Sequence, residues 1–123
     1  MIDNLKVEGV IQGVGDESQA QLLVSFNTDE PSTSQVEFGE GTGTTYAQKT
    51  QEDVNLTFNH LVVVSGLTPS KVYHLRALAK DSAGNITTSI DTVAITPKAT
   101  ESALDLVVTN LSDVFGFLGG VSR

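Results

Sequence analysis

The amino-acid sequence predicts an all-β fold, a seven-stranded antiparallel β-sandwich. Three observations lead to this prediction. Seven short segments alternate apolar and polar residues, and each has about the length of a strand in a globular protein. The segments between them are rich in Gly, Pro, Asp, Asn and Ser, which favour turns. Thr and Val are abundant, and no helical period is found before residue 98.

The expected strands follow one another closely along the chain. In order they are residues 4–11 (NLKVEGVI), 19–28 (QAQLLVSFNT), 33–39 (TSQVEFG), 44–50 (TTYAQKT), 55–64 (NLTFNHLVVV), 72–80 (VYHLRALAK) and 87–95 (TTSIDTVAI). The turns expected between them include GVGDES, DEPS, GEGTG, GLTPS and DSAGN. Seven such strands within a hundred residues are typical of a sandwich of two sheets.

Alternation within each strand predicts which side chains face the core. The inward set is Leu22, Val24, Phe26, Val36, Phe38, Val62, Val64, Tyr73, Leu75, Ala77 and Ala79, with Leu67 following its strand. The opposite parity places Leu23, Leu61 and Val63 on an outer face, where polar residues are usual in a sheet with one solvated side. These three residues are therefore a candidate contact surface.

Length, charge and cysteine content exclude several classes of protein. The chain has 123 residues, enough for one domain with its own core, and no cysteine to form a disulfide or a thiol nucleophile. Its net charge of −8 argues against nucleic acid and against anionic membrane surfaces as partners. No segment reaches the ~20 apolar residues of a membrane span, and the N-terminus lacks a signal-peptide pattern. The absence of cysteine fits an oxidising, extracellular location.

The segment GLTPSKVYHL carries the most specific spacing in the chain. Tyr73 opens a strand six residues after Leu67, a spacing that lets its ring fold over the preceding corner and its hydroxyl bind a backbone group upstream. Pro69 fixes the turn, and Leu67 closes the base of the core. This pattern predicts a tyrosine corner, a feature of immunoglobulin-like sandwiches.

Together with SFNTDEPSTSQVEFG, the segment GLTPSKVYHLRALAKDSAGN resembles bacterial fibronectin type III-like domains. The resemblance is strongest to the branch similar to the N-terminal domain of purple acid phosphatases, and it covers about residues 2–97. Phe26 stands where the family usually has a tryptophan on its second strand, and Phe38 takes the place of the third-strand aromatic. The resemblance implies an immunoglobulin-like domain over residues 1–97 that serves as a spacer, adhesion or accessory module.

The sequence shows no catalytic, cofactor-binding or metal-binding constellation. His60 and His74 lie on different expected strands without Cys, Asp or Glu at a ligand spacing, so a structural or surface role is favoured over a metal site for both. GEGTG lacks the Lys and the following helix of a phosphate loop. DSAGN offers Asp81 and Asn85, too few oxygens for calcium, and a turn with Gly84 at positive φ is favoured. No enzyme activity and no cofactor are expected.

Residues 98–123 extend beyond the region of family resemblance. Leu104, Val107, Val108, Leu111, Phe115 and Leu118 have the spacing of one helical stripe. Thr100 is a candidate N-cap, and Gly119 and Gly120 would end the helix. A strand or a linker remains the alternative, because Val107, Val108 and Thr109 are poor helix formers.

The apolar stripe requires a surface to cover it, since such a helix is marginal alone in water. The sequence predicts that it packs on Leu23, Leu61 and Val63, on a second copy of the chain, or on a neighbouring domain. The expected function is a non-catalytic structural or interaction module of a secreted or cell-surface bacterial protein. The alternatives are a self-assembling subunit of an extracellular filament and an accessory domain of a secreted hydrolase such as a metallophosphatase. Polysaccharide binding has little support, because the chain has no tryptophan.

Overall fold

The computed structural model describes residues 1–99 as an all-β, sandwich-like fold of antiparallel strands. The helical extension predicted within residues 98–123 lies almost entirely outside the described residues. The strands are β1 (Ile2–Gln12), β2 (Gln19–Glu40), β3 (Gln48–Lys49), β4 (Asp53–Leu67), β5 (Val72–Lys80), β6 (Ile86–Thr88) and β7 (Thr92–Ile95). A single turn of 3-10 helix, η1 (Gly15–Glu17), joins β1 to β2.

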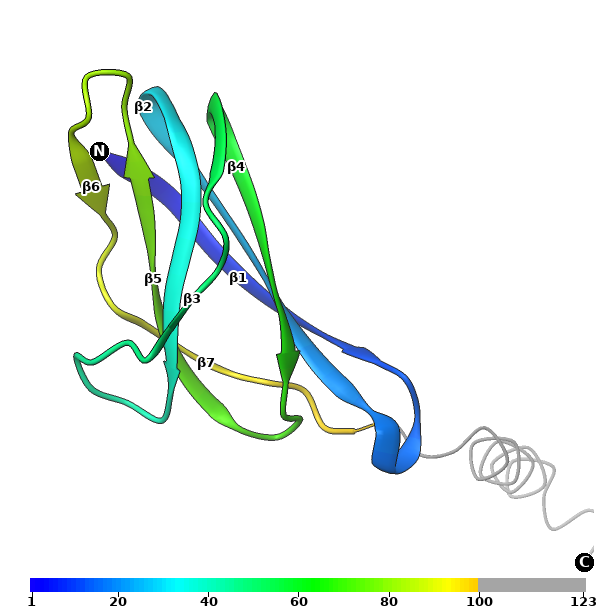
Figure 1. The fold of residues 1–123 in the computed structure, drawn as a ribbon. Coiled ribbons are helices and arrows are strands. Elements are labelled where there is room, and N and C mark those ends of the chain that lie inside the picture. The colour runs from blue at the N-terminus through cyan, green and yellow to red at the C-terminus, as the bar shows by residue number, and fades with distance from the viewer. Residues whose placement is uncertain (100–123) are drawn as a thin grey trace, which may run out of the picture.

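Strand β2 belongs to both layers of the fold (Figure 1). Its first half lies between β1 and β4, and we call these three strands the β4 sheet. Its second half pairs with β3 and β5, and β5 pairs in turn with β6 and β7; these strands form the β5 sheet. The register of the β2–β4 pairing shifts between Asn27 and Ser34. Figure 1 shows that β2 bends where its first half passes into its second. The seven strands are thus connected through β2.

Three strand predictions differ from the structure. The segments 19–28 and 33–39 were expected as separate strands, but backbone pairing continues through the bend and makes both part of β2. Only Gln48–Lys49 of the segment 44–50 forms a strand, because residues 41–47 form a loop. The segment 87–95 is split into β6 and β7 by residues 89–91, which leave the β-ladder.

The core lies between the two sheets and consists of the side chains that alternation predicted to face inward. The whole inward set is buried: Leu22, Val24, Phe26, Val36, Phe38, Val62, Val64, Leu67, Tyr73, Leu75, Ala77 and Ala79. Ala20 joins this cluster. The agreement follows from the pleat of a strand, which sends successive side chains to opposite faces.

His60 fastens the bend of β2. Its ring stacks on Phe26, with the two rings nearly parallel and their centroids 4.4 Å apart. Nε2 lies 2.9 Å from Thr28 Oγ1, and Nδ1 lies 2.6 Å from Ser34 Oγ, so one ring joins the two arms of the bend. Because the Thr28 hydroxyl donates to the Glu30 carbonyl, it accepts from Nε2–H. Burial lowers the pKa of His60 and favours the neutral ring, in which Nδ1 accepts from the Ser34 hydroxyl.

The corner between β4 and β5 is held by Tyr73. The backbone N–H of Thr68 donates to the Tyr73 hydroxyl at 2.9 Å, the kind of upstream contact expected from the sequence. The Thr96 hydroxyl donates to the Thr68 carbonyl at 2.6 Å, which ties the chain after β7 to the same corner. Leu67 is buried beneath the corner, and Pro69 is half-buried within it. The corner therefore fastens the end of the described chain as well as the β4–β5 connection.

We predict that Tyr73→Phe lowers the free energy of unfolding by about 1–3 kcal/mol, because the Thr68 N–H loses its partner in a part-buried position. Denaturant titration measures this change. Ser82→Ala is the control, because it removes a hydroxyl group from an exposed loop. It should leave the denaturation midpoint unchanged. An unchanged midpoint in Tyr73→Phe would show that the hydroxyl contributes nothing to the corner.

Candidate interaction surfaces

The outer face of the β4 sheet carries exposed apolar side chains. Leu23 and Val63 are cross-strand partners, and Leu61 pairs with Ser25 two positions further along, on the same face. Leu61 is 65% exposed and Val63 46% exposed, whereas Leu23 is half-buried between its neighbours. We call Leu23, Leu61 and Val63 the apolar strip. The structure thus brings together the three outward residues singled out from the sequence.

A shallow hollow lies beside the apolar strip, between β1 and β4. Lys6 and Glu8 of β1 form one wall, and Leu61 forms the other, with Leu23 and Ser25 between them. Glu8 is the cross-strand partner of Leu23. The strip is therefore bordered by one cation and one anion, an apolar centre with a charged margin that suits contact with another protein.

Strand β4 also exposes apolar residues that parity alone places inward. Val54, Leu56 and Phe58 share the parity of the buried His60 but are exposed. They lie beyond the bend of β2, where β4 pairs only with Ser32 and Ser34. In the described part of the chain β4 pairs with β2 alone, so it is an edge strand. Sequence reasoning missed this surface, because alternation does not reveal where the two layers stop overlapping.

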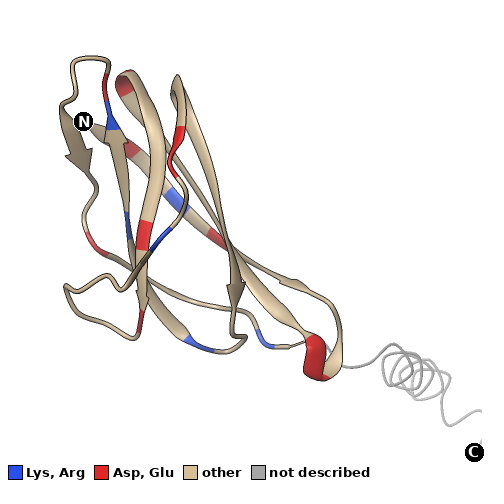
Figure 2. Ribbon diagram, viewed as in Figure 1, with Lys and Arg blue, Asp and Glu red and all other residues tan. Residues whose placement is uncertain are grey.

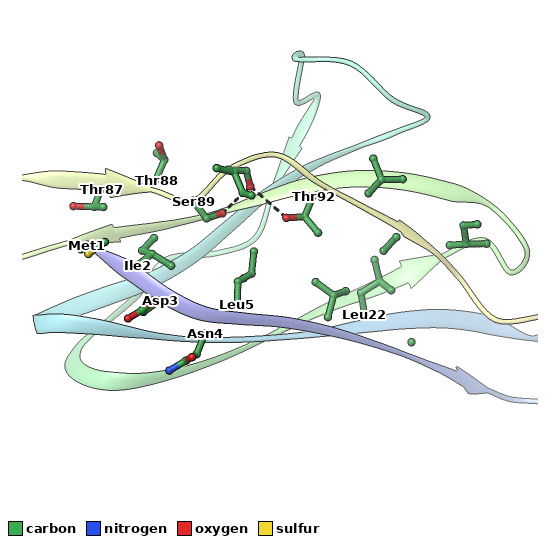
Figure 3. A pocket seen from close by; sticks show the side chains of 16 residues that line it. Met1, Ile2, Asp3, Asn4, Leu5, Leu22, Thr87, Thr88, Ser89 and Thr92 are labelled. Carbon is green, nitrogen blue, oxygen red and sulfur yellow. Dashed lines mark hydrogen bonds between the residues drawn. The ribbon is translucent and has the colours of Figure 1, made fainter.

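A groove opens on the other side of the fold, between β1 and the segment containing β6 and β7 (Figure 3). Its volume is about 710 Å³. Leu5 and Leu22 rise from its floor, and Thr87, Ser89 and Thr92 line the opposite wall. Like the edge of β4, this groove was not foreseen from the sequence.

The outer face of the β5 sheet carries a polar cluster covered by the loop 41–47. Tyr46 in this loop donates to Asp91 Oδ1 at 2.5 Å, and His74 Nδ1 lies 2.9 Å from the same oxygen. Arg76 lies over the Tyr46 ring, with Cζ 4.8 Å from its centroid, and its Nε bonds Glu37 Oε1. His74, expected on a solvated outer face, is only 2% exposed because this loop covers it.

Electrostatics in the polar cluster follow from this geometry. Hydrogen bonds from Tyr46 and His74 lower the pKa of Asp91 below its usual value. Desolvation by burial and the hydrogen bond that Tyr46 donates to Asp91 together raise the pKa of Tyr46 to about 12. A Cβ on Gly39 would lie 3.0 Å from His74 Nε2 and 3.1 Å from the Thr45 carbonyl, so glycine leaves room for both. His74 is thus enclosed on this side, and the hydrogen bonds of the cluster hold the loop 41–47.

The remaining candidates for chemistry take structural roles. Asp81 Oδ1 accepts the backbone N–H groups of Ala83 and Asn85, and Gly84 has φ of 89°. Within residues 1–99 no three His, Asp or Glu residues group in a way that could hold a metal ion. In the same range no helix has the length and hydropathy to cross a membrane. Figure 2 shows Lys and Arg dispersed over separate strands and loops, often beside acidic residues.

The predicted interface residues of the C-terminal extension lie outside the described residues: Leu104, Val107, Val108, Leu111, Phe115 and Leu118. Comparison with protein-family models, with curated proteins and with solved structures yields no match to this chain. The geometry of residues 1–99 is therefore the basis for any functional proposal.

Proposed function

We propose that the protein is a non-catalytic structural and interaction module of a secreted or cell-surface bacterial protein. Its contact surface is the apolar strip, which meets a second copy of the module during assembly. The exposure of Leu61 and Val63 on a paired sheet is the observation that carries this proposal. Apolar side chains gathered on one outer face mark contact sites in soluble proteins.

An immunoglobulin-like, fibronectin type III-like identity belongs to this proposal. The two-sheet arrangement of β1–β2–β4 and β2–β5 supports it, as does the hydrogen bond at the Tyr73 corner. Domains of this architecture carry many unrelated tasks, so the architecture alone names no ligand.

The polar groups of the described chain support a role without catalysis. His60 and His74 are buried, and the side chains that contact them hold the β2 bend and the loop 41–47. Asp81 is engaged by its own turn. The dispersed positive charge in Figure 2 gives no support to a nucleic-acid partner.

Leu61→Asp tests the contact surface. We expect the 123-residue chain to self-associate with rising concentration in sedimentation velocity. Leu61→Asp should weaken this association at least about tenfold, because a desolvated carboxylate would replace an apolar contact. Leu61 is 65% exposed, so the substitution should leave the folded monomer intact.

Asn59→Asp is the matched control, since Asn59 is exposed on the same strand at the same parity and receives the same charge. It should retain most of the association of the native chain. Equal weakening by both substitutions would assign the effect to general charge repulsion. A native chain that stays monomeric throughout the concentration series would contradict assembly through the strip.

A further inference from the structure

The groove between β1 and the β6–β7 segment has half-buried apolar walls at the open side of the fold (Figure 3). Ile2, Leu5 and Val7 of β1 pack partly against the core, as does Ala94 of β7. Their remaining surface faces the groove, which therefore continues the core to the edge of the sandwich. An apolar segment laid there would bury surface on both sheets at once.

The two strands that border the groove both have a free edge within the described part of the chain. There β1 pairs only with β2, and β7 only with β5. Figure 1 shows β1 and β7 running in the same general direction. An extended segment running the opposite way would be antiparallel to both strands and could pair its backbone with either edge.

The chain itself passes the end of this groove. After β7, Pro97 packs so closely on Gly9 that a Cβ added to Gly9 would lie 2.7 Å from Pro97 Cδ. Ser70 N–H donates to the Pro97 carbonyl at 3.0 Å, which fixes this crossing. Gly9 is also a lining residue of the groove. Residues 100–123 therefore continue from a point beside the groove.

The length of this continuation is more than sufficient. Returning along β1 from Gly9 to Met1 takes eight residue steps, or ~26 Å at ~3.3 Å per residue. A turn followed by an extended segment of about that length uses only the first half of residues 100–123. The chain can thus fill its own groove without strain in the connection.

The sequence after Thr100 has the pattern such a segment needs. In ESALDLVVT, Leu104, Leu106 and Val108 alternate with Asp105, Val107 and Thr109. An extended chain would send the first three toward the apolar groove and the other three away from it. Val and Thr also favour strands over helices.

We propose that residues 101–109 fold back in the same chain as an additional strand in the groove between β1 and β7. Leu104, Leu106 and Val108 then complete the open side of the core. This assignment uses the strand alternative for the extension and leaves the apolar strip available to the second copy.

Adjacent substitutions in the full-length chain distinguish this arrangement from the helical stripe. Leu106 faces the groove in the proposed strand but lies off the helical stripe. Val107 lies on the helical stripe but points away from the groove in the proposed strand. Leu106→Asp should lower the melting temperature by at least about 5 °C, and Val107→Asp by less than about 2 °C. In the Leu61→Asp chain, whose association through the apolar strip is weakened, the melting temperature should not vary with protein concentration, because the segment comes from the same chain.

Hydrogen exchange of the native full-length chain is a second measurement that requires no substitution. Amides within residues 103–109 should be protected. Exposed amides throughout this segment would overturn the proposal, as would a greater sensitivity to Val107→Asp or Leu111→Asp than to Leu106→Asp. In the Leu61→Asp chain, a melting temperature that rises with concentration, together with destabilisation by an added Leu106→Asp, would place another copy's segment in the groove and would also overturn the proposal.

Discussion

Phe26→Ala is expected to lower the free energy of unfolding by about 3–5 kcal/mol, the usual cost of emptying a buried aromatic site. Phe26 is 1% exposed in the core and stacks on His60, so its removal also loosens the ring that fastens the bend of β2. For a domain of this size the melting temperature should fall by more than about 12 °C. Denaturant and thermal unfolding measure the two quantities independently.

Phe58→Ala is the matched control, because it removes the same side chain from the strand that pairs with Phe26. Phe58 is 52% exposed beyond the overlap of the two sheets, so its removal should cost less than about 1 kcal/mol. Similar losses in the free energy of unfolding from Phe26→Ala and Phe58→Ala would contradict the conclusion that the core ends where β2 bends away from β4.

Asp91→Ala is expected to destabilise the protein by about 2–3 kcal/mol. It removes the oxygen that binds both Tyr46 and His74, and it leaves the buried imidazole without that partner. The loop 41–47 should lose its anchor, so hydrogen exchange in this loop should accelerate more than in the core strands.

Acid provides an independent check of the same cluster. The two hydrogen bonds lower the pKa of Asp91 in the folded protein below the ordinary value of 3.8. Its contribution to stability is therefore present above that value and is lost as the pH falls through the folded pKa. The difference between the native protein and Asp91→Ala should shrink in that range.

A double-mutant cycle of Tyr46→Phe and Asp91→Ala separates the effect of the Tyr46–Asp91 hydrogen bond from the general effect of removing a charge. Since both side chains share one hydrogen bond, their effects should be less than additive. Asp81→Ala serves as the control, because its bonds stay within the turn 81–85 and should leave the loop 41–47 unchanged. Strict additivity of Tyr46→Phe and Asp91→Ala would contradict the shared bond.

The core was predictable from sequence because period-two alternation survives tertiary folding. Leu22, Val24 and Phe26 point one way whatever the exact strand ends, and they are buried as expected. The same alternation predicted that Leu23, Leu61 and Val63 point outward. Local sequence was also sufficient at the Tyr73 corner, since donor and acceptor lie five residues apart.

Features that depend on distant segments were not predictable in this way. His74 was expected on a solvated face but is covered by Tyr46, which reaches it from a loop between β2 and β3. Phe58 has core parity yet lies outside the core, because β2 has already bent away. The groove depends on the spacing of β1 and β7, whose residues are separated by most of the domain.

The path of the chain through the sandwich has a mechanical consequence. Met1 and the chain beyond β7 lie toward opposite ends of the long axis, and β1 and β7 carry the two ends (Figure 1). Tension between these ends would act along β1 and β7 and would load the β1–β2 and β5–β7 hydrogen bonds in shear. Several bonds must then break together, instead of one after another. Because β2 passes through both layers, the force on one sheet is transmitted covalently to the other.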